Sequence, residues 1–214
     1  MDEDISIINS NTRNEKVRNY FVKNKNKIIL LIIVLVISLV AAYSYDRHKV
    51  NQKKLVSNKF NLTTLEYIDS NKDNTLSSLI DIVNKKDPTY SPLALYFIID
   101  NKLLSDSKKI NDLFEVLIEQ TSLDKEIKNL VIYKKALFNA DGAQENDLLD
   151  ILNPLINSQS VWKSHALYLM AEYFYSKNQN QKSKEFYNQI ITLEKSNPDI
   201  KQQAQKRLNR DLSE

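Results

Sequence analysis

The sequence predicts an all-helical protein: one transmembrane helix near the N-terminus, then a domain built from paired helices. Two observations support this prediction. Residues 28–45 (IILLIIVLVISLVAAYSY) contain no charged side chain, and a helix of this length reaches across most of the hydrocarbon core of a bilayer. From residue 46 to residue 214, apolar residues recur at helical spacing, and no segment alternates as a strand does.

Charges on either side of the apolar segment predict its orientation. Residues 1–27 hold six Lys or Arg and four acidic residues, and five further cations follow the segment closely. A short tail with six cations is difficult to move across a membrane, whereas a long domain crosses largely regardless of its charge. We therefore expect residues 1–27 to be a cytoplasmic tail, disordered over residues 1–11, and residues 46–214 to lie outside the cytoplasm.

A cleaved signal peptide is the alternative to a permanent anchor. Val40 and Ala42 have the residue spacing that signal peptidase accepts. However, the apolar run and the segment before it are both longer than is usual in signal peptides. The sequence therefore favours an uncleaved, single-pass anchor over residues 28–45.

Composition excludes several classes of function. The domain of residues 46–214 holds 24 cations and 23 acidic residues, and this near-neutral balance disfavours nucleic-acid binding. The chain has no cysteine, which excludes disulfides, thiol nucleophiles and cysteine-based metal sites. Its single glycine excludes glycine-rich phosphate-binding loops, which need several.

The first half of the domain predicts five helices. Residues 50–70 form the first, which is broken at residues 71–74, and the second carries apolar residues from Leu76 to Val83 and ends at Pro88. Ser91 and Pro92 predict the capped start of a third helix, which is apolar on most sides and therefore buried. A fourth follows with an apolar stripe over residues 110–118. The fifth starts at residues 121–122, and its expected buried face is Ile127, Leu130, Val131, Leu137 and Phe138.

The second half of the domain predicts four more helices. We expect Gly142, in the turn at 139–143, to have a positive φ, Asn146 to cap the sixth helix and Pro154 to end or kink it. Ser160 caps the seventh helix, and an asparagine takes the left-handed position in the turn at 177–180 that leads to the eighth. The last helix starts at Asn197 and Pro198 and has a polar outer side.

These helical pairs recur at a nearly regular interval. The expected starts at Ser91, Ser122 and Ser160 lie 31 and 38 residues apart, around the roughly 34-residue period of tetratricopeptide repeats. The last pair resembles that repeat most closely, because large, small and aromatic residues follow in the repeat's order: Leu167, Met170, Ala171, Phe174, Ser183, Tyr187 and Ile190. We therefore expect a short tetratricopeptide-like solenoid of helical hairpins.

The whole layout resembles a bacterial family of tetratricopeptide-repeat-like, single-pass inner-membrane proteins that includes an ancillary subunit of the Sec translocon. A phrase typical of that family occurs at Leu152–Leu155 and Trp162–Ala171. The resemblance implies a periplasmic domain that binds translocon subunits, chaperones or secretory precursors and assists secretion or protein folding. An envelope adaptor for cell division or wall assembly and a plain structural oligomeriser remain alternatives, and the sequence leaves the oligomeric state open.

Tyrosines are the candidate binding residues of the domain. Packing between helices is the simpler interpretation of their abundance. The alternative is that several line the groove of a solenoid, where they offer rigid, amphipathic surface to extended peptides. The candidates for such a peptide-binding face are Tyr96, Tyr133, Tyr168, Tyr173 and Tyr187.

No residue pattern predicts catalysis, a metal site or a cofactor. His48 and His165 are the only histidines, and we expect His48 to be exposed and His165 to be partly buried in a structural role. Acidic pairs one helical turn apart, such as Asp147 and Asp150, are expected on solvated faces, because acid–base catalysis needs a desolvated pocket. We therefore expect a binding protein and not an enzyme.

Overall fold

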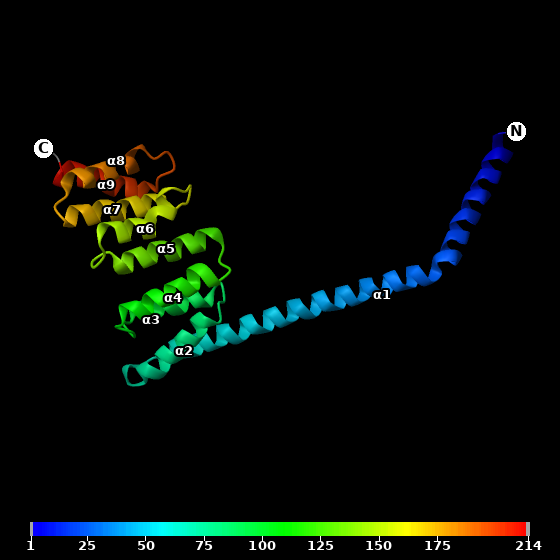
Figure 1. Ribbon diagram of the computed structural model, residues 1–214, viewed down its shortest axis with the longest axis horizontal. Coiled ribbons are helices and arrows are strands. Elements are labelled where there is room, and N and C mark those ends of the chain that lie inside the picture. The colour runs from blue at the N-terminus through cyan, green and yellow to red at the C-terminus, as the bar shows by residue number, and fades with distance from the viewer. Residues whose placement is uncertain (1, 213–214) are drawn as a thin grey trace. The chain divides into compact units, whose positions relative to one another are not determined.

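A computed structural model describes the backbone of residues 2–212 and the side chains of residues 15–212 (Figure 1). Within these residues the chain is all-helical and contains no strand, which confirms the predicted fold class at this level. The chain divides into two compact units, one up to Lys54 and one from Leu55 onward.

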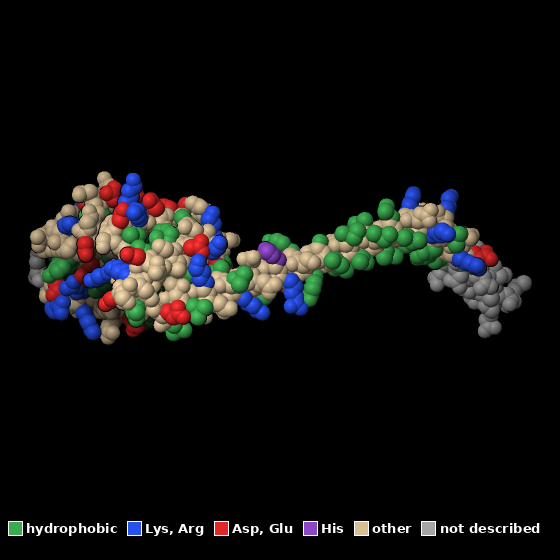
Figure 2. Space-filling view, turned by 90° about the horizontal axis from the view of Figure 1, so that it is seen from below, with side chains coloured by type: hydrophobic (Ala, Val, Ile, Leu, Met, Phe, Trp, Pro, Cys, Tyr) green, Lys and Arg blue, Asp and Glu red, His purple; other side chains and the backbone are tan. Residues whose placement is uncertain are grey.

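One long helix, α1 (Asp2–Leu65), contains the whole apolar segment. Its most apolar window has a mean hydropathy of 2.8, and no part of that window is buried by other described residues. A core helix of a soluble domain would be mostly buried, whereas a helix surrounded by lipid is not. Figure 2 shows the hydrophobic side chains as a continuous band along α1. The described chain thus has one helix that is long and apolar enough to span a membrane.

The helix α1 begins at Asp2, within the tail that precedes the apolar segment.

After α1, the described part of the second unit is a succession of short helices. Each α-helix packs on the next one along the chain, and contacts also join α2 to α4, α5 to α7, and α7 to α9. The elements are η1 (Asp69–Asn71), α2 (Lys72–Asn84), α3 (Tyr90–Asp100), α4 (Ser107–Gln120), α5 (Lys125–Asn139), α6 (Glu145–Ile156), α7 (Lys163–Ser176), α8 (Asn180–Thr192) and α9 (Pro198–Asp211).

Two hydrophobic clusters hold these helices together. The main cluster draws buried residues from α2 through α7, and a smaller one joins α7, α8 and α9. At the crossing of α7 and α8, Ser183 is fully buried and its Oγ donates to the carbonyl of Ala171 at 2.9 Å. Ala171 and Ser183 are both small, which allows these two helices to approach closely.

Several helix starts differ from the sequence prediction. Ser91 and Pro92 lie inside the first turn of α3, because Asp87 Oδ1 accepts from the backbone of Thr89 and Tyr90 at 2.8 Å each and so starts the helix earlier. The fifth helix starts at Lys125, after residues 121–122, and the sixth at Glu145, before the predicted cap. Asn197, by contrast, caps α9 as predicted, through bonds from Asp199 and Ile200.

Backbone conformations correct one prediction and confirm another. Gly142 does not have a positive φ, so the prediction for this glycine was wrong. A β-carbon built at Gly142 would meet no atom within 4 Å, so packing does not require glycine there either. Asn178 does take the left-handed conformation, with a φ of 57°, and Lys86 and Lys102 also have positive φ values. The hydrogen-bonded turn, and not residue type alone, decides where the left-handed residue lies.

Candidate protein-binding surface

Exposed apolar side chains in the helical domain gather on particular helices. Among the described residues after Ile68, the large hydrophobic side chains that are exposed are Leu93 on α3, Ile127 and Leu137 on α5, and Val161 in the turn before α7. None comes from α2, α4, α6, α7, α8 or α9. We call the exposed surface of α3, α5, α7 and this turn the odd-helix face. A single exposed apolar side chain is common on protein surfaces and needs no explanation. The grouping of these four side chains on α3, on α5 and in the turn before α7 does need one.

A hollow of about 240 Å³ lies on the odd-helix face between α3 and α5. Tyr96, from α3, forms part of its wall, and Lys134 Nζ, from α5, lies 5.4 Å from the centroid of the Tyr96 ring. Burial raises the pKa of Tyr96 to about 12, so its hydroxyl keeps its proton. That hydroxyl has no hydrogen-bond partner within the described chain. The other lining residues are Ile99, Asp100, Leu137 and Phe138.

An aromatic cluster joins α5 to the start of α7. Tyr133 stacks on Trp162 with ring centroids 5.7 Å apart, and His165 lies 5.0 Å from Trp162 and 5.7 Å from Tyr133. The indole nitrogen of Trp162 donates to the carbonyl of Glu126 at 3.2 Å, which fixes the stack. His165 is partly buried, as expected, and burial lowers its pKa against the opposing effect of the Val161 carbonyl. The ring is therefore neutral near pH 7.

A charged network lies at the other end of α7. Glu172 accepts from Arg207 Nε at 2.6 Å and from the Tyr187 hydroxyl at 2.5 Å, and Arg207 Nη2 also donates to it. Arg207 Nη1 donates to Asp211 at 2.5 Å. Burial alone would raise the pKa of Glu172, but bonds from Arg207, Tyr187 and Tyr168 lower it below its ordinary value. These paired groups join α7, α8 and α9.

The five candidate tyrosines therefore divide into two sets. Tyr173 is 8% exposed with its hydroxyl donating to the Ala143 carbonyl, and Tyr187 is fully buried. These two side chains pack within the domain and offer little surface to a peptide. Tyr96, Tyr133 and Tyr168 keep part of their surface exposed on α3, α5 and α7.

Sequence reasoning missed the apolar residues of the odd-helix face. It placed Ile127 and Leu137 on the buried face of the fifth helix, but they are 41% and 42% exposed. The sequence does contain a sign of this exposure. The apolar residues of this helix extend around more of its circumference than the single stripe that packing on a core requires.

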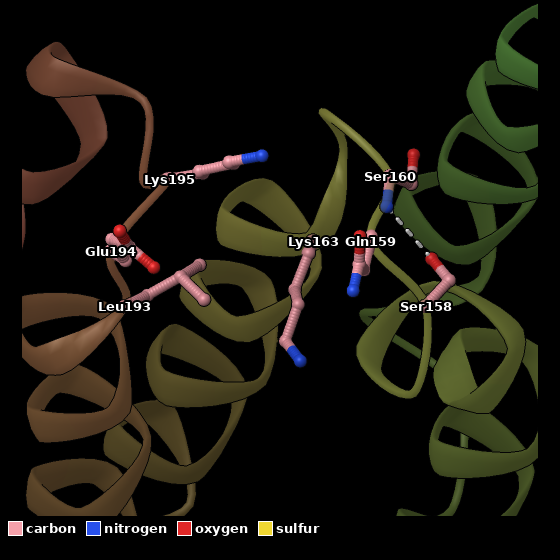
Figure 3. A pocket seen from close by; sticks show the side chains of 7 residues that line it. All are labelled: Ser158, Gln159, Ser160, Lys163, Leu193, Glu194 and Lys195. Carbon is pink, nitrogen blue, oxygen red and sulfur yellow. Dashed lines mark hydrogen bonds between the residues drawn. The ribbon is translucent and has the colours of Figure 1, made fainter.

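Two further hollows were not predicted. One, of about 290 Å³, lies between the end of α5 and α7 and includes Asp141, Leu169 and Lys177. The other, of about 310 Å³, lies between the loop before α7 and the loop after α8 (Figure 3). Its lining carries both signs of charge: Ser158, Gln159, Ser160, Lys163, Leu193, Glu194 and Lys195.

The described side chains form no group of three His, Asp or Glu that could hold a metal ion. Comparisons of the chain with protein families, curated proteins and solved structures found no match.

Proposed function

We propose that this chain is a membrane-anchored scaffold that binds other proteins through the odd-helix face. The observation that carries the proposal is that, among the described residues after Ile68, the exposed large apolar side chains lie only on α3, on α5 and in the turn before α7. Fully burying an exposed leucine-sized side chain contributes about 1.5–3 kcal/mol, and these side chains, which are 41–65% exposed, would each contribute roughly half of that on binding. Partly exposed tyrosines next to them supply amphipathic contact area.

In this proposal the helical domain is a short solenoid of tetratricopeptide-like hairpins. Contacts between neighbouring helices, with additional contacts from α2 to α4, α5 to α7 and α7 to α9, support such a repeating arrangement. Repeat arrays of this kind bind extended segments along one surface. The hollow between α3 and α5 has the size to accept an apolar side chain of the bound segment.

We further propose where the scaffold acts. The resemblance to the translocon-associated family supports a bacterial inner-membrane location, with the domain in the periplasm. The partners in this proposal are translocon subunits, chaperones or secretory precursors.

Site-specific photocrosslinking in cells tests the proposal. The photoreactive residue replaces Leu137 on α5, and a matched control replaces Asn153, which is exposed on α6. We expect crosslinks to translocon subunits or secretory precursors from position 137 and not from position 153. Equal crosslinking from both positions, or none from position 137, would refute binding through the odd-helix face.

A further inference from the structure

The last turns of α1, within the second unit, carry apolar side chains that are largely exposed. Leu55, Leu62 and Leu65 are 63%, 58% and 82% exposed. The spacings of seven and three residues place them on one side of the helix, in the a and d positions of a heptad. Asn58, which is also exposed, takes the remaining d position. We call these four residues the outer stripe.

The opposite side of the same turns packs into the domain. Val56 and Phe60 join the main hydrophobic cluster, and the Phe60 ring lies 5.7 Å from that of Tyr90. Ser57 Oγ donates to the Tyr90 hydroxyl at 2.7 Å. This part of α1 is therefore fixed in the fold, and the exposure of the outer stripe does not come from a frayed helix end.

We propose that the outer stripe pairs with the outer stripe of a second copy of this chain, as a short parallel coiled coil. The stripe begins ten residues after the apolar segment ends at Tyr45. Copies anchored in one membrane share the same orientation, so equivalent residues meet across a twofold axis.

The charge next to the outer stripe is compatible with this pairing. Lys59 directly follows Asn58, and its Nζ lies 2.8 Å from Asp81 Oδ2 of the same chain. The ion pair reduces the repulsion that two facing lysines would otherwise produce.

The area of the outer stripe determines where the pair forms. At about 25 cal/mol per Å², the 1.5–3 kcal/mol gained by burying a leucine corresponds to roughly 60–120 Å² of apolar surface. Three partly exposed leucines therefore offer roughly 120–240 Å² per copy. A stable dimer in solution buries about 800 Å² per partner. The outer stripe alone is too small for that. The pair therefore forms only where the membrane confines both anchors and raises their effective concentration.

Disulfide crosslinking of the full chain in its membrane tests the pairing. The natural chain has no cysteine, so single-cysteine variants give one unambiguous reaction. L62C places the thiol in the outer stripe, and N61C places it on the next exposed residue, about 100° around the helix. After brief oxidation we expect L55C, L62C and L65C each to give about five-fold more disulfide-linked dimer than N61C.

A charge within the seam provides the second variant. In a double variant that combines L55K with L62C, the dimer yield is expected to fall to that of N61C. In the control double variant, which combines N61K with L62C, the yield is expected to stay high. Dispersing the membrane in excess detergent is also expected to lower the yield from L62C. Equal yields from L62C and N61C, or an L62C adduct with a different protein, would overturn the pairing. None of these readouts depends on the odd-helix face.

Discussion

Replacing Glu172 by glutamine is expected to loosen α9 from the rest of the domain. One carboxylate on α7 accepts from Arg207 on α9 and from Tyr187 on α8, so it connects three helices. The smaller hydrophobic cluster that also holds α9 has only six buried residues. The charged network is therefore a large part of what fixes this terminal helix.

The size of the effect follows from the exposure of the pair. Buried hydrogen bonds to charged groups contribute about 1.5–3 kcal/mol, while exposed ion pairs contribute about 0–1 kcal/mol. The side chains of Arg207 and Glu172 are 23% and 29% exposed, which is closer to the buried case. We expect E172Q to lower the free energy needed to open α9 by about 2 kcal/mol. The equilibrium constant for opening then rises roughly 30-fold.

Amide hydrogen exchange resolves this change helix by helix. In E172Q, amides of α9 are expected to exchange roughly 30-fold faster, while those of α2 to α4, which have no contact with α9, keep their rates. The control is E185Q on α8, because the Glu185 carboxylate is exposed and accepts from Gln181 of its own helix. The same exchange rates in E172Q and E185Q would refute the role assigned to Glu172.

Three more predictions concern the helical domain. Glu172 and Asp211 have lowered pKa values, that of Asp211 being about 2, so the stabilisation of α9 is complete above about pH 5 and is lost as pH falls towards 2; circular dichroism during acid titration measures this. S183L is expected to lower the free energy of unfolding by about 2–4 kcal/mol in urea titrations, because residue 183 is fully buried at the α7–α8 crossing. K102G is expected to raise the same free energy by about 0.5–1 kcal/mol, since lysine is strained at a φ of 50°, whereas N178G changes it little because asparagine tolerates that conformation.

Local chemistry explains which predictions agree with the structure. The capped start of α9 depends on Asn197 and on the proline that follows it, and both act within one helical turn. The predicted starts of α3 and α6 were misplaced because the nearest strong capping residue does not set where the backbone first becomes helical. Asp87 sets the start of α3, and the turn before Glu145 sets the start of α6.

The sequence by itself determined that the described chain is helical and has one apolar helix long enough to span a membrane, because periodicity and hydropathy are properties of consecutive residues. Only the tertiary structure decided which apolar residues are covered. Leu137 and Tyr187 both fit helical patterns, yet the first is 42% exposed and the second is fully buried. Glu172 and Arg207 lie 35 residues apart, and only the packing of α7 against α9 brings them together. The exposure of a side chain and its ion pairs depend on residues of other helices. The sequence pattern of one helix does not show which residues these are.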